Sequence, residues 1–201
     1  SEAWVSVYLG AEFGRLPEDG AYYAEELAQA EREGRVCELP PDPALPVHTF
    51  WDLGIADDTT VWFGQVSGSG AGAPAWRWID YYENAGVALD HYARVLQERA
   101  AARKYVYGDH VWPHDGAHRD PGILGGKTRR EVFADLGFKT IILPRHHLAD
   151  GIEAVRRLIR VSRFDARACQ AGLRKLRRYK RAFDAARGVF ENRPQHDDAS
   201  H

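Results

Sequence analysis

Three consecutive strand-like segments constrain the fold of this chain most strongly. Residues 47–52 (VHTFWD), 59–66 (TTVWFGQV) and 75–83 (AWRWIDYYE) are rich in the β-branched and aromatic side chains that fit a pleated sheet. The connections between them are short, and the second contains SGSGAGAP, whose glycines and serines are typical of a loop. Because consecutive strands joined by short loops pair in antiparallel fashion, the sequence predicts a three-stranded antiparallel meander.

The rest of the chain alternates between helical and strand-like patterns. The expected elements are a helix over 85–104, a strand over 105–115, a helix over 127–137, a strand over 139–144 and helices over 149–186. Strands that run parallel are joined by helical crossovers, which lie on the faces of the sheet. The sequence therefore predicts an α/β fold, in which a mixed sheet combines the meander with parallel strands and is flanked by helices.

The first 46 residues differ from the rest in composition. Segment 22–36 (YYAEELAQAEREGRV) is rich in helix formers, with Gly34 as a stop, and the following ELPPDPALPV is a proline-rich connector. We expect residues 1–46 to form a linker, or approach segment, and residues 47–201 to form the main domain.

Composition excludes several classes of protein. A hydrophobic content of 44% with six tryptophans is ample for a packed core in 201 residues. The formal charge of -2 by itself favours neither a nucleic-acid binder nor a membrane binder, and no apolar run approaches the ~20 residues of a membrane span. Cys37 and Cys169 are far apart and lack metal-ligand spacing, which indicates a reducing interior. We expect a soluble, cytosolic protein.

Acidic residues follow several of the expected elements. Asp52 ends the first strand of the meander, Asp115 ends the strand over 105–115, and Asp197 with Asp198 begins an expected terminal helix. Strand ends on one edge of a sheet converge when the strands are neighbours. If the strand over 105–115 pairs beside the first strand, Asp115 lies next to Asp52 and an acidic cluster forms.

Clustered carboxylates suit hard cations such as Mg²⁺ or Mn²⁺. Two such ions about 3.5–4 Å apart can clamp the attacking water and the leaving oxygen of a phosphodiester, so the cluster predicts hydrolysis of a nucleic-acid backbone. The alternative is that each acid only forms a turn or caps a helix.

Other polar side chains near these acids receive supporting roles. Asp57 is expected to pair with Thr59 in the tight turn after the first strand, and His114 and His196 are expected to orient a ligand or approach a phosphate. Three other nearby acids either contact the metal ligands or are solvated, and we favour the solvated alternative for them: Asp58, Asp80 and Glu83.

Positive charge is concentrated between residues 156 and 181, where Asp165 is the only acid. Such a run can be a solvated helix face, but solvated faces normally mix both signs of charge, which favours contact with the phosphate backbone of DNA. The abundance of arginine fits gripping without base readout. The candidate DNA-binding residues are Arg156, Arg160, Arg174, Lys175, Arg177, Arg178, Lys180 and Arg181.

Taken in order, four segments resemble the nuclease domain of the large terminase subunit of tailed bacteriophages. They are WDLGIADDTTVWF, VWPHDG, the helical stretch that begins DGIEAVRRLI, and HDDASH, and the resemblance covers about Tyr22 to His201. It implies a ribonuclease H-like fold over 47–201 and an endonuclease that cuts concatemeric genome DNA into packaged units, with little sequence specificity.

The resemblance also implies a ligand set for two divalent ions, Mg²⁺ or Mn²⁺. Asp52 matches the first metal-binding aspartate of the family and Asp115 the second. The third falls in the C-terminal motif, where Asp198, Asp197 or a residue beyond His201 would supply it, and we take Asp198 as the expectation.

Full terminase subunits also contain an ATPase, yet no GxxxxGK[ST] motif occurs in these 201 residues. The resemblance therefore implies an isolated nuclease domain whose partners are double-stranded DNA, the ATPase domain absent from this chain, the portal and the small terminase subunit, with no membrane. It would act in the host cytoplasm and be absent from the mature virion. Two alternatives stay open, namely a DNA-gripping module of the motor without catalysis, and a junction resolvase or transposase core of the same fold.

Overall fold

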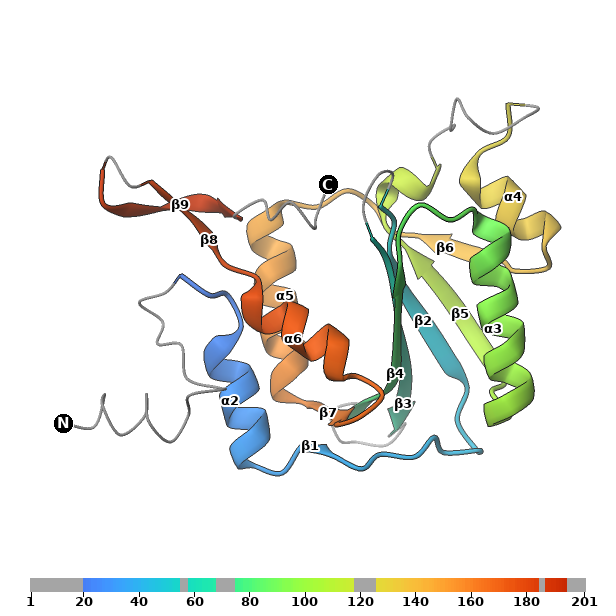
Figure 1. The fold of residues 1–201 in the computed structure, drawn as a ribbon, viewed down its shortest axis with the longest axis horizontal. Coiled ribbons are helices and arrows are strands. Elements are labelled where there is room, and N and C mark those ends of the chain that lie inside the picture. Colours follow the sequence, from blue (N-terminus) through green and yellow to red (C-terminus); the bar gives the residue numbers. More distant parts are fainter. Residues whose placement is uncertain (1–19, 55–57, 68–74, 118–125, 185–186, 195–201) are drawn as a thin grey trace.

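A seven-stranded mixed sheet organises the parts of the chain that the computed structural model describes, which are residues 20–54, 58–67, 75–117, 126–184 and 187–194 (Figure 1). The strand order is β1-β7-β4-β3-β2-β5-β6. The strands are β1 (Val36–Cys37), β2 (Val47–Asp52), β3 (Thr59–Ser67), β4 (Ala75–Asn84), β5 (Tyr107–Trp112), β6 (Thr140–Ile142) and β7 (Ser162–Asp165). The helices are α2 (Ala24–Arg32), α3 (Leu89–Arg103), α4 (Arg129–Asp135), α5 (Leu148–Arg160) and α6 (Gln170–Arg178).

The predicted meander is confirmed by antiparallel pairing of β2 with β3 and of β3 with β4. All the other pairs in the sheet are parallel, so β3 alone runs against the remaining six strands. The carboxyl ends of β2, β4 and β5 therefore meet at one edge of the sheet, where β3 begins. Ligand sites of open α/β sheets form at such an edge.

Helices cover both faces of the sheet, as predicted. In Figure 1, α3 and α4 lie on one face, while α2, α5 and α6 lie on the other. The first face buries a core that includes Phe63, Trp112 and Phe133, and the second buries a core that includes Ile159 and Leu173. Alternation along β2 sends successive side chains to opposite faces, which places them in different cores.

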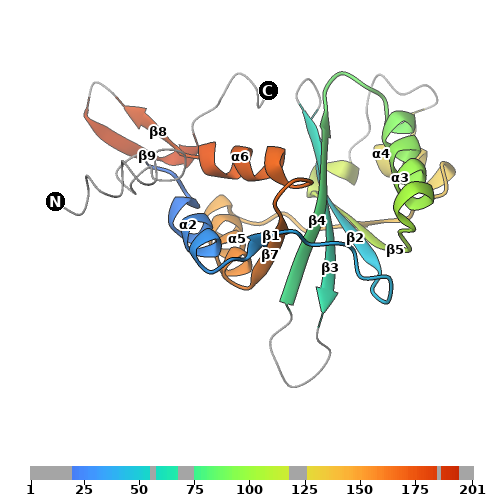
Figure 2. The same cartoon turned by 60° about the horizontal axis from the view of Figure 1, so that its bottom comes forward.

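The expectation of helix throughout 149–186 was wrong in two places. Residues Ser162–Asp165 form β7, which pairs in parallel with both β4 and β1. This strand alternates strictly, with Ser162 and Phe164 buried, but four residues are too few for the pattern to stand out between two long helices. After α6, β8 (Arg181–Asp184) and β9 (Val189–Pro194) form an antiparallel hairpin that projects from the body of the domain (Figure 2).

The segment over 20–46 contributes to the core, which the sequence analysis did not anticipate. Leu27 and Ala30 of α2 are buried against the face that α5 and α6 cover, and β1 forms an edge of the sheet. Arg35 fixes this segment by donating from Nη1 to the carbonyl oxygens of Ile159 and Ser162, each at 2.7 Å. Residues 40–46 connect β1 to β2 without regular structure. The division of the chain into two parts at residue 46 stays a prediction.

Asp80 was expected to be solvated, and this was wrong, because the residue is only 2% exposed. It lies on the face of β4 that α3 covers, where Arg99 Nε and Arg103 Nη1 approach its Oδ2 at 3.2 and 3.4 Å. Burial raises the pKa of Asp80, and the two guanidinium groups oppose that rise. The pairing fastens α3 to the sheet. None of the described helices is long and apolar enough to cross a membrane.

His110 of β5 is buried in the core, which keeps its imidazole neutral. The hydroxyl of Thr49 lies 2.7 Å from its Nδ1 and also accepts a hydrogen bond from Trp51 Nε1 at 2.7 Å. A hydroxyl has one proton to donate and two lone pairs to accept with, so Thr49 partners Nδ1 in either neutral tautomer of His110 while it accepts from Trp51. Burial lowers the pKa of His110 from 6.5 to about 4.

The depressed pKa of His110 predicts a stability loss in mild acid. The contribution of neutral His110 to the free energy of unfolding is fully present above pH 6.5. It is lost as the pH falls from 6.5 towards 4, because the histidine of the unfolded chain takes up a proton first. The free energy of unfolding should fall by up to about 1.4 kcal/mol per pH unit from this group. Chemical denaturation of the wild type and of His110→Asn, which keeps an acceptor for Thr49, measures the difference; equal slopes in the two proteins would contradict it.

Candidate metal centre

Asp52 is placed at the carboxyl edge of the sheet by its buried neighbours. Trp51 and Leu53 are both buried in the core beneath α3, so the side chain between them points to the opposite face, on which α6 lies. Register pairs Asp52 with Thr60 of β3, and Thr60 with Glu83 of β4. Directly paired residues of antiparallel strands share a face, so Asp52 and Glu83 project from the same side. Asp52 itself is exposed to solvent.

Asp115 reaches the same edge from the turn that follows β5. The 3-10 helix η2 (His114–Ala117) folds back over the end of that strand, with Gly116 N donating to the carbonyl of Pro113 at 3.1 Å. The turn can lie this close because Gly116 has no side chain, since a Cβ there would be 2.8 Å from the Trp112 ring. Parallel pairing of β2 with β5 then places Asp115 beside Asp52, as the sequence predicted.

The two carboxylates interact electrostatically. Although Asp52 is exposed at the edge of the sheet, the protein around its carboxyl group reduces its hydration and so raises its pKa. The negative charge of Asp115 raises the pKa further, while the positive charge of Lys175 acts against both. Oδ1 of Asp115 is itself buried and has no hydrogen-bond partner among the described residues. A buried carboxylate oxygen without a partner, beside a second carboxylate, fits the oxygen ligands that a hard divalent cation requires.

Two further acids, Asp58 and Glu83, lie at this edge, where they are half-buried and paired with a lysine instead of being surrounded by solvent alone. Lys175 of α6 places its Nζ 2.5 Å from Asp58 Oδ2 and 2.9 Å from Glu83 Oε2. Glu83 Oε2 also accepts a hydrogen bond from the hydroxyl of Tyr81 at 2.6 Å. The strand alternation that puts Glu83 on the face of Asp52 was visible in the sequence, but the pairing with Lys175 needed the position of α6.

Several residues predicted for the site lie outside the described residues: Asp57, His196, Asp197 and Asp198. Within the part of the chain that is described, no three His, Cys, Asp or Glu side chains are grouped to hold a metal ion. Thr59 is buried, and its hydroxyl donates to the carbonyl of Gly54 at 3.4 Å, which closes the turn between β2 and β3. His114 is exposed on η2, next to Asp115.

Comparison with known proteins finds no matching family model and no matching curated protein. Solved structures do match. The nuclease domain of the phage P22 large terminase is 19% identical, with 80% of this chain and 81% of that one covered and a TM-score of 0.51. The large terminase nuclease of thermophilic phage G20c with bound magnesium is 14% identical, with 90% and 92% covered and a TM-score of 0.52. The chain has the fold of a terminase nuclease domain.

This ribonuclease H-like fold confirms the predicted fold class. A large terminase from another thermophilic bacteriophage matches with a TM-score of 0.61 and 15% identity, covering 84% of this chain. The chain spans only 40% of the length of that protein.

Four of the eight predicted DNA-binding residues of this terminase-like fold make hydrogen bonds or ion pairs within the domain. Arg156 donates to the carbonyl of Tyr22 at 2.9 Å, and Arg160 pairs with Glu26 at 3.1 Å. Arg177 pairs with Glu31, and Lys175 holds the two acids described above. Three of these contacts join α5 or α6 to α2 or to Tyr22, two residues before it, so much of the basic run holds the helical layer together.

Four of the predicted cations remain available for a partner. Arg174 and Arg178 are one helical turn apart on α6, and both are exposed. Lys180 is half-buried, and Arg181 at the start of the hairpin is exposed, with its guanidinium 5.8 Å from the centroid of the Tyr22 ring. These four residues lie on α6 and the chain that leaves it, so they run from the carboxylate edge towards the hairpin (Figure 2).

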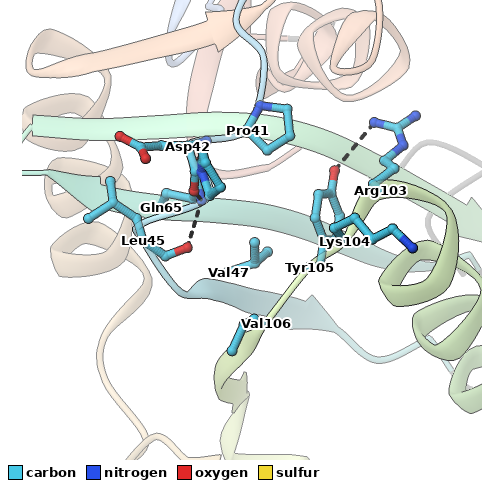
Figure 3. A pocket seen from close by; sticks show the side chains of 10 residues that line it. Pro41, Asp42, Leu45, Val47, Gln65, Arg103, Lys104, Tyr105 and Val106 are labelled. Atoms are coloured by element: carbon cyan, nitrogen blue, oxygen red, sulfur yellow. Dashed lines mark hydrogen bonds between the residues drawn. The ribbon is translucent and has the colours of Figure 1, made fainter.

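A cavity of about 50 Å³ lies at the opposite end of the terminase-like sheet (Figure 3). Val47 lines it, and this residue begins the strand that Asp52 ends. Gln65, another lining residue, has both ends of its amide bonded, since it donates to the carbonyls of Asp42 and Leu45 and accepts from the amide of Asp42. The cavity is therefore separate from the carboxylates, and Gln65 in its wall holds residues 42–45 in place.

The raised pKa of Asp52 predicts that its charge destabilises the domain when no cation is bound. A carboxyl whose folded pKa lies above its unfolded value costs stability at neutral pH, so Asp52→Asn should raise the melting temperature in EDTA. Addition of Mn²⁺ should stabilise the wild type but not the variant. Differential scanning calorimetry measures both effects, with Asp109→Asn as the control for loss of one exposed acid. A variant that melts below the wild type in EDTA would contradict the prediction.

Proposed function

We propose that this protein is a metal-dependent endodeoxyribonuclease of a viral genome-packaging motor, which cuts concatemeric double-stranded DNA with little sequence specificity. One observation carries the proposal: the buried, unpartnered Oδ1 of Asp115 lies beside Asp52 at the carboxyl edge of the sheet. The fold shared with terminase nuclease domains supports it, as does the magnesium bound in the phage G20c structure.

In this proposal Asp52 and Asp115 hold two divalent ions, Mg²⁺ or Mn²⁺, and Asp198 or Asp197 completes the ligand set. Such ions, when bound, lower the pKa of the attacking water and neutralise charge on the phosphodiester. The chain itself supplies ligands on rigid elements, because β2 and η2 are both anchored by buried aromatic residues. Gly116 is part of this rigidity, since it lets η2 pack against Trp112.

The proposed partners follow from the same assignment. Double-stranded DNA is the substrate, and the ATPase domain of a large terminase is the expected neighbour along the motor. We also propose contacts with the portal and the small terminase subunit, and action in the host cytoplasm before the mature virion forms.

The proposed chemistry predicts cleavage of supercoiled plasmid in Mg²⁺ or Mn²⁺ and none in EDTA. Asp52→Asn and Asp115→Asn should each reduce the rate by at least about 10²-fold, because each removes a ligand of the ions that stabilise the developing charge. Agarose gels of nicked and linear product measure the rate, and Asp109→Asn serves as the control that changes an exposed acid away from the edge.

Other outcomes of this assay separate the competing functions. Intact plasmid in every lane, with DNA binding retained, would favour a gripping module without catalysis. In favour of that alternative, the described residues contain no group of three metal-ligating side chains. Preferential cutting of four-way junctions over linear duplex would instead favour a junction resolvase of the same fold.

The exposed cations of α6 predict a salt-dependent contact with the DNA backbone. Replacing Arg174 and Arg178 together by alanine should weaken binding equally for unrelated duplex sequences and lower the slope of log K against log salt by about 2. Fluorescence anisotropy over a salt series measures this slope. The matched control is Arg94→Ala with Arg130→Ala, which removes the same charge from the helices on the other face; an equal effect in the control would contradict a localised DNA track.

A further inference from the structure

Lys175 is the single cation that contacts acids of the carboxylate edge among the described residues. Its Nζ bridges Asp58 and Glu83, which come from the start of β3 and the end of β4. Burial disfavours its charge, but the hydrogen bonds to the two carboxylates outweigh burial and raise the pKa of Lys175. The ammonium is therefore a permanent positive charge at neutral pH, and its effect extends to Asp52.

The acids of this edge outnumber its one cation within the described ranges 20–54, 58–67, 75–117 and 126–184. Asp52, Asp58, Glu83 and Asp115 supply four carboxylates, and Lys175 supplies one positive charge in return. Asp58 and Glu83 are engaged by the ammonium, whereas Oδ1 of Asp115 is left without a partner. The edge is thus divided into a pair of acids that shares one internal positive charge and a pair that is open to an external cation.

Close packing of α6 on the sheet fixes where this ammonium lies. Gly172, one turn before Lys175, is so close to the sheet that a Cβ on it would be 2.4 Å from the Trp62 ring and 2.7 Å from the Tyr81 ring. Leu173 is buried in the same layer. The helix presents both Gly172 and Lys175 to the sheet, because residues three apart share a helix face.

We propose that Lys175 is a positioning residue that acts as an internal counter-ion and keeps Asp58 and Glu83 out of the metal ligand set. Divalent ions are then confined to the open pair, Asp52 and Asp115, instead of spreading along the row of acids. This inference rests on the proposed function, because it assigns metal binding to the same edge. Loss of a residue that supports metal binding weakens cation binding. Loss of Lys175 should instead strengthen it.

The test is calorimetric titration of the whole chain with MnCl₂ in the absence of DNA. Lys175→Met should bind Mn²⁺ about tenfold more tightly than the wild type, with more ions bound per chain, because a nearby positive charge is removed and two carboxylates are released. Lys175→Arg, which keeps the charge, should stay within about twofold of the wild type on the same reasoning. Arg157→Met is the matched control, as it removes an exposed cation of α5.

Lys175→Gln provides a second neutral variant, and circular dichroism checks that each variant folds. Unchanged or weaker Mn²⁺ binding in the folded neutral variants would overturn the inference, as would an equal gain in Arg157→Met. Loss of the fold in both neutral variants would also overturn it, since Lys175 would then be a structural ion-pair partner. Failure of the proposed function is distinguishable, because Asp52→Asn would then bind Mn²⁺ as the wild type does.

Discussion

Parallel pairing between β2 and β5 is the contact on which the carboxylate edge depends. The two strands are distant in sequence, and the register Phe50 to Val111 brings their ends together. A shift of one residue would turn Asp52 to the other face of the sheet and bury it under α3. The register is secured from within the core, where Thr49 binds both His110 and Trp51 through one hydroxyl. A buried polar contact on one face thus sets the geometry of the charged site on the other.

Repulsion between like charges is the cost of such a site. Asp115 raises the pKa of Asp52, and neither carboxylate is offset by a direct ion pair among the described residues. Two acids in the same row are offset, because α6 brings Lys175 onto them. The helix can approach only because Gly172 leaves room for the Trp62 ring. Packing in the aromatic layer and the distribution of charge at the edge are therefore parts of one arrangement.

The sequence predicted the meander, the parallel strands and the meeting of Asp52 with Asp115, because each depends on patterns within a segment or on the order of strands. It did not predict β7, whose four residues are too short to show a period, or the burial of Asp80, which depends on arginines of α3. The contacts of Arg156, Arg160 and Arg177 were missed for a similar reason. A run of positive charge gives no sign of which members face a neighbouring helix.

The position of β1 has a mechanical consequence. This short strand follows α2 directly and is joined to β7 by backbone bonds of 2.8 Å from Phe164 N to Arg35 O and from Ala166 N to Cys37 O, with a third bond of 2.9 Å from Leu39 N to Asp165 Oδ2. These bonds lie across the strand axis, so tension along β1 loads them together in shear. A pull through the residues before α2 reaches these bonds only after those that join Gly20 to Arg181 and Tyr22 to Tyr179, and β7, β4 and β3 then separate β1 from β2, the strand that carries Asp52.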